Sequence, residues 1–270
     1  MNFLMNGNFS ASLGHNFIED LKWARVKAYL PEKDGISAKE KGLEKKHALL
    51  ILDDKEILRR KKDLIGNGLA NTSGNYEIQL GKKYKGGPIE MHLELLRVPF
   101  QKSKIDLRVQ FVIRTLQPVW RENQNGQSYN WNYCLPSLFW HEIRCRFDAW
   151  TVFGAVKLAA DKKKRLSGVK VSAYDFDWVK DDDLGSAITD ESGHFRIDFC
   201  SKDFKKTYLS PLINIETPLS AIPGPGVYFK VSSYNGKFIY EEEPSYGKLQ
   251  ERSNIPNCFH IDLVVNEALV

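Results

Sequence analysis

Tyr174-Asp-Phe-Asp-Trp-Val-Lys-Asp-Asp-Asp-Leu-Gly-Ser-Ala-Ile-Thr-Asp-Glu-Ser-Gly-His-Phe-Arg-Ile-Asp198 is the stretch of this chain that decides the fold. It begins with the end of a strand, passes through an acidic loop into a short strand, and turns at Asp190–Gly193. Gly193 can take the positive φ that closes such a turn, and Phe195 and Ile197 then alternate with polar residues. Two short strands joined by a tight turn predict an antiparallel sheet.

A weaker copy of this stretch lies at residues 53–78, where a charged loop at residues 55–62 follows the end of a strand. Four segment pairs match: Val26-Lys-Ala28 with Val156-Lys-Leu158, Leu52-Asp53 with Tyr174-Asp175, Asp63-Leu-Ile-Gly66 with Asp182-Asp-Leu-Gly185, and Ser73-Gly74-Asn-Tyr76-Glu-Ile78 with Ser192-Gly193-His-Phe195-Arg-Ile197. Such self-similarity predicts an internal repeat. Each half has roughly six or seven short strands and almost no helical periodicity, which predicts two β-sandwiches.

The repeat divides the chain into four predicted segments. They are a polar N-terminal arm at residues 1–16, a first sandwich at 17–116, an aromatic-rich connector at 117–149, and a second sandwich at 150–270.

Two interpretations of the connector stay open. Its aromatic residues either join the two sandwiches or form a surface for a partner protein, with a platform for a sugar or a base as a minor alternative. Tryptophan and tyrosine are enriched at the energetic centres of protein interfaces. The candidate partner-binding residues are Trp120, Trp131, Tyr133 and Trp140.

The pattern Leu184-Gly-x-x-x-Thr-Asp-x-x-Gly-x-Phe195 resembles the transthyretin-like or carboxypeptidase regulatory-like β-sandwich family. The resemblance covers residues 150–265, and it is weaker over residues 20–116, where Ala70-Asn71 replaces Thr189-Asp190. It implies an all-β chain with two prealbumin-like, Greek-key sandwiches in tandem. The pattern is a signature of the fold and carries no chemistry by itself.

Composition narrows the class of protein. With 270 residues, 42% of them hydrophobic, the chain is long enough for two folded domains. Its 39 basic and 34 acidic residues are mixed along the sequence, so no nucleic-acid surface is predicted.

The expected location is the cytoplasm. No signal-peptide pattern and no apolar run of membrane-spanning length occurs. The cysteines Cys134, Cys145, Cys200 and Cys258 lack metal-ligand spacing, so we expect free thiols in a reducing compartment. A disulfide between Cys134 and Cys145 stays open as an alternative.

The acidic loop offers one candidate metal site. Calcium prefers several carboxylate oxygens that converge, and Asp175, Asp177 and Asp183 surround a single loop. Such acidic residues are also commonly solvated or cap turns. No cofactor is expected for this chain, with calcium as the possible exception.

No catalytic motif is found. The chain has no GxSxG elbow and no phosphate-binding GxxxxGK[ST] loop. It also lacks the C-terminal Tyr-Arg-Gly-Ser signature of the transthyretin-like hydrolase, and His260 has no nearby histidine to complete an intradiol-type iron site. We therefore predict a non-enzymatic scaffold or binding protein with a protein partner. A calcium-dependent binding module and an intradiol-dioxygenase-like or hydrolase enzyme are the alternatives, while the partner and the oligomeric state stay open.

Overall fold

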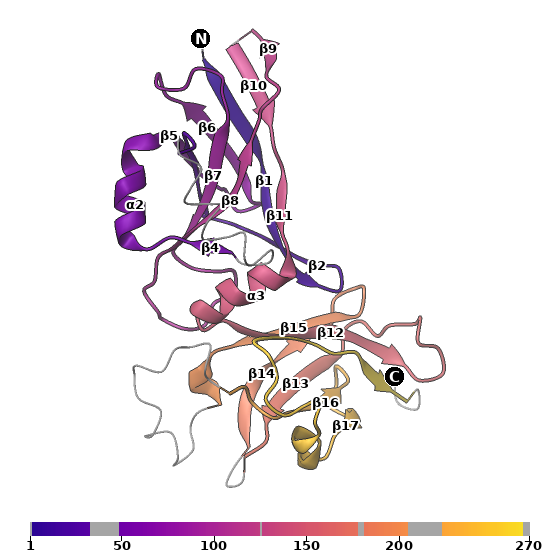
Figure 1. Cartoon of the computed structure of the whole chain (residues 1–270). Coiled ribbons are helices and arrows are strands. Elements are labelled where there is room, and N and C mark those ends of the chain that lie inside the picture. Colours follow the sequence, from indigo (N-terminus) through magenta and orange to yellow (C-terminus); the bar gives the residue numbers. More distant parts are fainter. Residues whose placement is uncertain (1, 33–48, 125, 178–180, 205–222, 267–270) are drawn as a thin grey trace. The chain divides into compact units, whose positions relative to one another are not determined.

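The computed structural model describes residues 2–32, 49–124, 126–177, 181–204 and 223–266 (Figure 1). Strands predominate in these ranges, which confirms the predicted all-β class. The chain divides into two compact units. Unit 1 contains residues 1–99 and 106–143, and unit 2 contains residues 100–105 and 144–270, so the chain passes between the units three times. No helix among the described residues is long and apolar enough to cross a membrane.

Unit 1 is built from two sheets. The first has β1 (Phe3–Gly14) at its centre, between β6 (Asn75–Leu80) and β2 (Phe17–Asp20) on one side and β10 (Gly126–Asn130), β11 (Tyr133–Leu135) and β9 (Arg121–Asn123) on the other. The second sheet follows the order β4 (Leu50–Ile51), β8 (Val109–Leu116), β7 (Ile89–Leu95), β3 (Arg25–Tyr29), β5 (Leu64–Leu69). Alternate residues such as Ile78 and Val26 are fully buried. This alternation is what a sandwich core requires of each strand.

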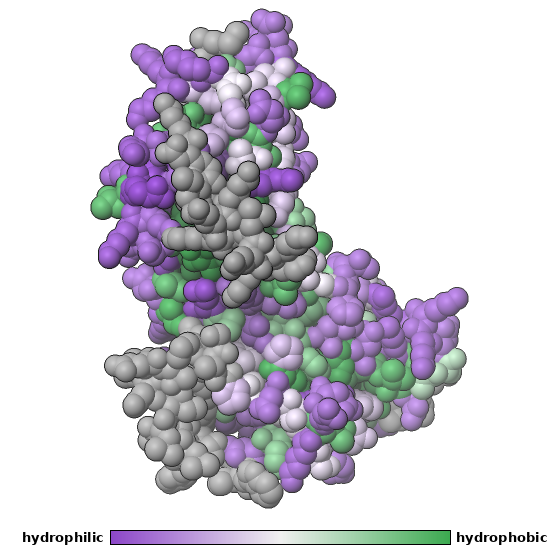
Figure 2. All heavy atoms as spheres, viewed as in Figure 1, coloured by the Kyte–Doolittle hydropathy of each residue, from purple (hydrophilic) through white to green (hydrophobic). Residues whose placement is uncertain are grey.

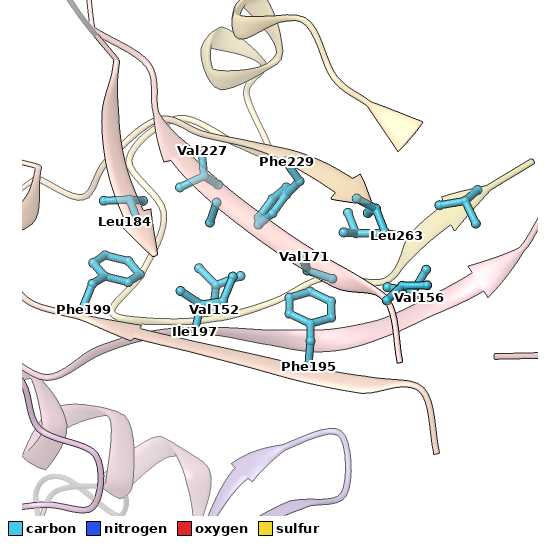
Figure 3. Packing of buried hydrophobic residues seen from close by; sticks show 14 of the residues in the cluster. Val152, Val156, Val171, Leu184, Phe195, Ile197, Phe199, Val227, Phe229 and Leu263 are labelled. Carbon is cyan, nitrogen blue, oxygen red and sulfur yellow. The ribbon is translucent and has the colours of Figure 1, made fainter. Parts of the chain in front are cut away.

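Unit 2 has the same two-sheet construction. One sheet pairs β12 (Trp150–Leu158) with β15 (His194–Phe199) and with β18 (Cys258–His260) and β19 (Leu263–Val265). The other follows the order β14 (Asp182–Ile188), β13 (Lys170–Asp175), β16 (Val227–Ser232), β17 (Phe238–Glu241). Figure 3 shows Val171 and Phe229 of one sheet pointing toward Val152 and Ile197 of the other, and all four are buried. Each such side chain stabilises the sandwich by about 1.5–3 kcal/mol.

The two units repeat one strand order and one register. In both, the first strand pairs with the strand after the tight turn (β1 with β6, β12 with β15) and lies parallel to the last strand. Ala28 pairs with Gly66 and Met91, just as Ala173 pairs with Gly185 and Phe229. The turns also agree, because Asn71 and Asp190 each accept two backbone N–H groups at 2.9–3.0 Å.

The register decides between the matches predicted from sequence. The pairs Asp63–Gly66 with Asp182–Gly185 and Ser73–Ile78 with Ser192–Ile197 occupy equivalent strands and turns, so these matches are confirmed. The other two matches are wrong. Val26 lies on β3, whereas Val156 lies on β12, which is the counterpart of β1. Leu52 is not the equivalent of Tyr174, because the register places Tyr29 at that position.

Two predicted segment boundaries are also corrected. Residues 3–14 are no arm, because β1 has partners on both sides. The connector at 117–149 supplies β9, β10 and β11, which complete unit 1 as β18 and β19 complete unit 2. β10 and β11 pair with β1, more than a hundred residues earlier in the chain, so a local pattern does not reveal them.

Within the described ranges, two α-helices accompany the strands. The charged segment expected to be a loop forms α2 (Asp54–Arg60), because the Asp53 side chain accepts the Glu56 N–H at 2.7 Å and the Glu56 carboxylate accepts the Asp53 N–H at 3.2 Å. This reciprocal pair is a capping box, which fixes the start of a helix. The second helix, α3 (Ser137–Arg146), lies at the end of the predicted connector.

Candidate functional site

The predicted aromatic surface is divided between core and surface. Trp140 is fully buried and donates its indole N–H to the Glu19 carboxylate, so it cannot meet a partner. Trp120 donates to the Tyr84 hydroxyl at 3.1 Å and packs against Phe3, with ring centroids 4.8 Å apart. Both therefore stabilise unit 1.

Trp131 and Tyr133 are half-buried. Their ring centroids lie 5.4 Å and 6.2 Å from that of Phe9, and 5.5 Å from each other. Their outer faces stay accessible, so a contact with a partner at these two residues stays a prediction.

The predicted calcium ligands differ in exposure and in hydrogen-bond partners. Asp175 is buried and accepts the Gly226 N–H at 2.8 Å, whereas Asp183 is exposed and accepts the Gly185 N–H at 2.8 Å. Asp177 is half-buried, and its N–H donates to Asp181 at 3.2 Å. In the part of the chain that the structure describes, which omits residues 178–180, no three His, Cys, Asp or Glu side chains are placed to hold a metal ion. The calcium prediction receives no support from these residues.

A groove of about 720 Å³ in unit 1, which we call the α2 groove, is the candidate site. It is bounded by α2, by β3, β5 and β7, and by Arg108 just before β8, on the outer face of their sheet. Figure 1 shows α2 beside this sheet. In Figure 2 the surface around α2 is mainly hydrophilic, with isolated hydrophobic residues. The lining residues are Arg25, Lys27, Tyr29, Asp54, Ile57, Leu58, Lys61, Leu64, Asn67, Glu94, Leu96 and Arg108.

The floor of the groove is an ion-pair cluster. Lys27 Nζ lies 2.6 Å from Glu94 Oε2 and 2.9 Å from Gln110 Oε1. Arg25 Nη1 approaches the other oxygen of Glu94 at 3.3 Å. Glu94 is buried while Arg25 is half-exposed, so the carboxylate holds two cations at the boundary between the sheet and the groove.

Beneath the floor, a chain of hydrogen bonds fixes each side chain. Because Lys27 holds the oxygen of Gln110, the amide nitrogen faces the Tyr29 hydroxyl at 3.1 Å and His92 Nδ1 at 3.0 Å. His92 Nδ1 then accepts, so its proton lies on Nε2, which donates to Glu90 at 2.7 Å. Burial lowers the pKa of His92 and keeps the ring neutral.

Arg60 joins α2 to this network. Its buried guanidinium contacts Glu90 at 2.9 Å and the Leu30 carbonyl at 2.8 Å, and it lies over the Tyr29 ring. Burial alone would raise the pKa of Glu90, but the bond from His92 and the charge of Arg60 outweigh it and hold that pKa below its ordinary value. The helix wall and the floor of the groove are therefore one connected structure.

The rim of the groove is apolar and the lining carries a positive excess. Leu58 is 71% exposed and Leu96 is 57% exposed, which is unusual for large aliphatic side chains beside a cavity. The lining contains four cations and two carboxylates, which leaves an excess of two positive charges. The cations are Arg25, Lys27, Lys61 and Arg108, and the carboxylates are Asp54 and Glu94.

Unit 2 serves as an internal comparison. At the register positions of Lys27 and Glu94 it has Ser172 and Ser232, so it reaches the same sandwich without an ion pair at these positions. Burying charges costs free energy that a partner charge only partly returns. The sandwich therefore does not require the cluster in unit 1. Sequence reasoning missed the site because its residues come from separate elements and share no motif. The one visible signal was polar residues inside the apolar strand Ile89-Glu-Met-His-Leu-Glu-Leu95.

Comparison with known proteins identifies no family. No protein-family model matches the chain, and no curated protein matches it. Among solved structures, the Bacillus anthracis TIE protein is 11% identical with a TM-score of 0.28, and the match covers 98% of this chain and 34% of that one. The SpaE basal pilin from Lactobacillus rhamnosus GG is 11% identical with a TM-score of 0.25, covering 98% of both chains. A streptococcal ancillary pilin is 9% identical with a TM-score of 0.25, covering 100% of this chain and 63% of that one.

This chain spans about a third of the length of the TIE protein. TM-scores of this size do not establish a common fold, so the similarities assign neither a family nor a function.

Proposed function

We propose that this chain is a non-enzymatic structural or binding protein that contacts a protein partner through unit 1. The observation that carries the proposal is the α2 groove. A rigid hydrogen-bonded floor with an exposed aliphatic rim is typical of a binding surface, because a partner gains apolar burial at the rim and orientation from the floor.

The residues that most resemble a catalytic group support a non-enzymatic role. His92 is fully buried, and both of its ring nitrogens are engaged by Gln110 and Glu90. A general base must reach the proton that it removes from a substrate. These side chains instead orient Tyr29 and Lys27 at the floor of the groove. Their role is therefore structural support for binding.

Family and location form part of the same proposal. The hairpin with Asp190 and Gly193, repeated at Asn71 and Gly74, supports a transthyretin-like assignment. Cys134, Cys145, Cys200 and Cys258 are all free thiols, which supports the reducing conditions of the cytoplasm.

The native size of the protein in lysate of its source cell tests the proposal. The full chain, at its natural abundance, is expected to elute by size-exclusion chromatography well above its own 31.0 kDa, together with another protein. Chemical crosslinking before lysis controls for weak complexes. Elution as a free 31.0 kDa species both with and without crosslinking would contradict a scaffold role.

A further inference from the structure

We infer that the α2 groove binds an extended segment of the partner protein in which a carboxylate side chain stands next to aliphatic side chains. This inference rests on the proposed function, because it assumes that the partner is a protein. It adds the chemistry of the segment and the residues that recognise it.

The charges of the lining select an anion. The excess of two positive charges attracts a carboxylate, and two of the cations can still donate to one. Lys27 has three N–H groups and uses two for Glu94 and Gln110. Arg25 is half-exposed and makes a single 3.3 Å contact with Glu94. An incoming carboxylate between these cations therefore forms charge-assisted hydrogen bonds without breaking those of the floor.

The rim selects aliphatic neighbours for that carboxylate. Ile57 and Leu58 of α2 stand on one wall, with Leu64 and Leu96 contributed by the sheet. Because Leu58 and Leu96 are mostly exposed, the groove alone does not enclose a small ligand at these points, whereas side chains of a protein segment would cover both. The groove also reaches β5, the last described strand of its sheet, where an extended backbone can lie alongside.

The chain's own charged segment is a poorer occupant. Residues 33–48, which lie outside the described ranges, contain five lysines and three acidic residues. Their excess positive charge has the same sign as that of the groove. Charge complementarity therefore favours a separate, acidic partner segment.

A peptide titration tests the inference on the full chain. The probe is acetyl-Leu-Val-Glu-Leu-Asp-Leu-amide, and its matched control has glutamine and asparagine in place of the two acids. Amide chemical shifts from ¹H–¹⁵N spectra are expected to change at Arg25, Lys27, Asn67 and Glu94, with the neutral peptide binding about tenfold more weakly. The equivalent face of unit 2, around Lys170 and Ser172, is expected to stay unchanged.

A pair of variants separates the groove from general electrostatics. Arg25→Gln removes one groove cation, and Lys170→Gln removes the same charge at the equivalent position of unit 2. Both side chains are on the surface, so the melting temperatures should match that of the parent. We expect Arg25→Gln to weaken the acidic peptide about fivefold or more, and Lys170→Gln to leave its Kd unchanged.

Three results would overturn the inference: equal affinity of the acidic and neutral peptides, equal loss in both variants, or shift changes outside the α2 groove. A concentration-dependent rise in mass without peptide, abolished by Arg25→Gln, would show a second copy as the occupant and would also overturn it. If a large native complex survives Arg25→Gln unchanged, the proposed function stands and the inference fails. If the protein elutes alone, the proposed function fails, and the titration alone decides what the groove binds.

Discussion

At the scale of single residues, the buried carboxyl group of Asp175 should make the stability of this protein depend on pH. Asp175 is the last residue of β13. Burial and the neighbouring Asp177, Asp182 and Asp181 raise its pKa to about 7, and the hydrogen bond from the Gly226 N–H only partly opposes this rise. An unfolded chain gives this group an ordinary pKa of 3.8. Between these two values the folded state holds a proton that the unfolded state loses.

This difference predicts the stability of unit 2 against pH. The free energy of unfolding should fall by roughly 2–4 kcal/mol as pH rises from about 4 to about 7, because folding requires either the proton or a buried charge. Asp175→Asn should remove that slope and stabilise the protein at pH 8. Urea unfolding at pH 4.5 and pH 8 measures the change in the free energy of unfolding for the parent and for Asp175→Asn. Asp183→Asn, at an exposed carboxylate, is the control. An unchanged slope in Asp175→Asn would contradict the assignment.

The floor of the α2 groove gives a second prediction for a single residue. Glu94→Gln leaves Lys27 largely buried beside a neutral group, so the free energy of unfolding should fall by about 2–4 kcal/mol. The equivalent change in unit 2, Ser232→Ala, removes no charge and should cost less than about 0.5 kcal/mol. Denaturant titrations of both variants compare them. Equal costs would mean that the ion pair contributes nothing to unit 1.

At the scale of elements, the final strand of each unit passes directly over a glycine of the first strand. A Cβ on Gly7 would lie 1.9 Å from the carbonyl oxygen of Trp131, and one on Gly154 would lie 1.6 Å from that of Ile261. The same close approach in both units marks the point where the last strand bends from its first pairing to its second, between β10 and β11 and between β18 and β19.

Alanine at either glycine should therefore displace the last strand. We expect Gly7→Ala and Gly154→Ala each to lower the free energy of unfolding by about 3 kcal/mol or more, since backbone must move to admit the methyl group. Gly87→Ala, with no atom within 4 Å of its Cβ position, is the matched control and should be nearly neutral. Thermal unfolding of the three variants provides the measurement, and a neutral Gly7→Ala would refute the close approach.

The elements predicted correctly from sequence were those with local signals. The turns at Gly74 and Gly193 depend on residues within five positions of each other, and their asparagine or aspartate caps were visible. The helix α2 also had a readable signal in Asp53 and Glu56, which the charged composition obscured. The helical residues Trp140, Ile143, Arg144 and the following Phe147 are buried at spacings of three and four, which is a helical pattern inside the aromatic-rich segment.

The rest required the folded chain. The last strands are parallel neighbours of β1 and β12, and parallel pairing across such a separation leaves no short-range pattern. The α2 groove likewise gathers Lys27, Glu94 and Gln110 from three strands. Neither a repeat nor a motif places such side chains together, so the candidate site could not be predicted.

For the whole molecule, the chain's three passages between units decide how it can be divided. Unit 1 takes β1 to β7 from before residues 100–105 and β8 to β11 from after them. Residues 100–105 belong to unit 2, where the Ser103 hydroxyl donates to the Phe147 carbonyl and Arg196 lies 4.1 Å from the Phe100 ring centroid. Cleaving the backbone within residues 100–105 therefore does not separate unit 1 from unit 2.

A protease site introduced after Lys104 tests this organisation. The two fragments, residues 1–104 and 105–270, should co-elute in native size-exclusion chromatography and separate only in denaturant, because β7 pairs with β8 and β1 with β10 across the cut. The uncut protein carrying the same site is the control. Fragments that separate without denaturant would contradict the assignment of the strands to one unit.

The parallel pairing of first and last strands has a mechanical consequence. Tension applied between the start of β1 and the end of β11 pulls the two strands in opposite directions along their length. The hydrogen bonds between the strands are then loaded in shear all at once, and they do not break one after another. The same loading applies to β12 with β18 and β19. Each unit should therefore resist being stretched along the chain far better than being pulled open from the side, a property suited to a link that transmits force.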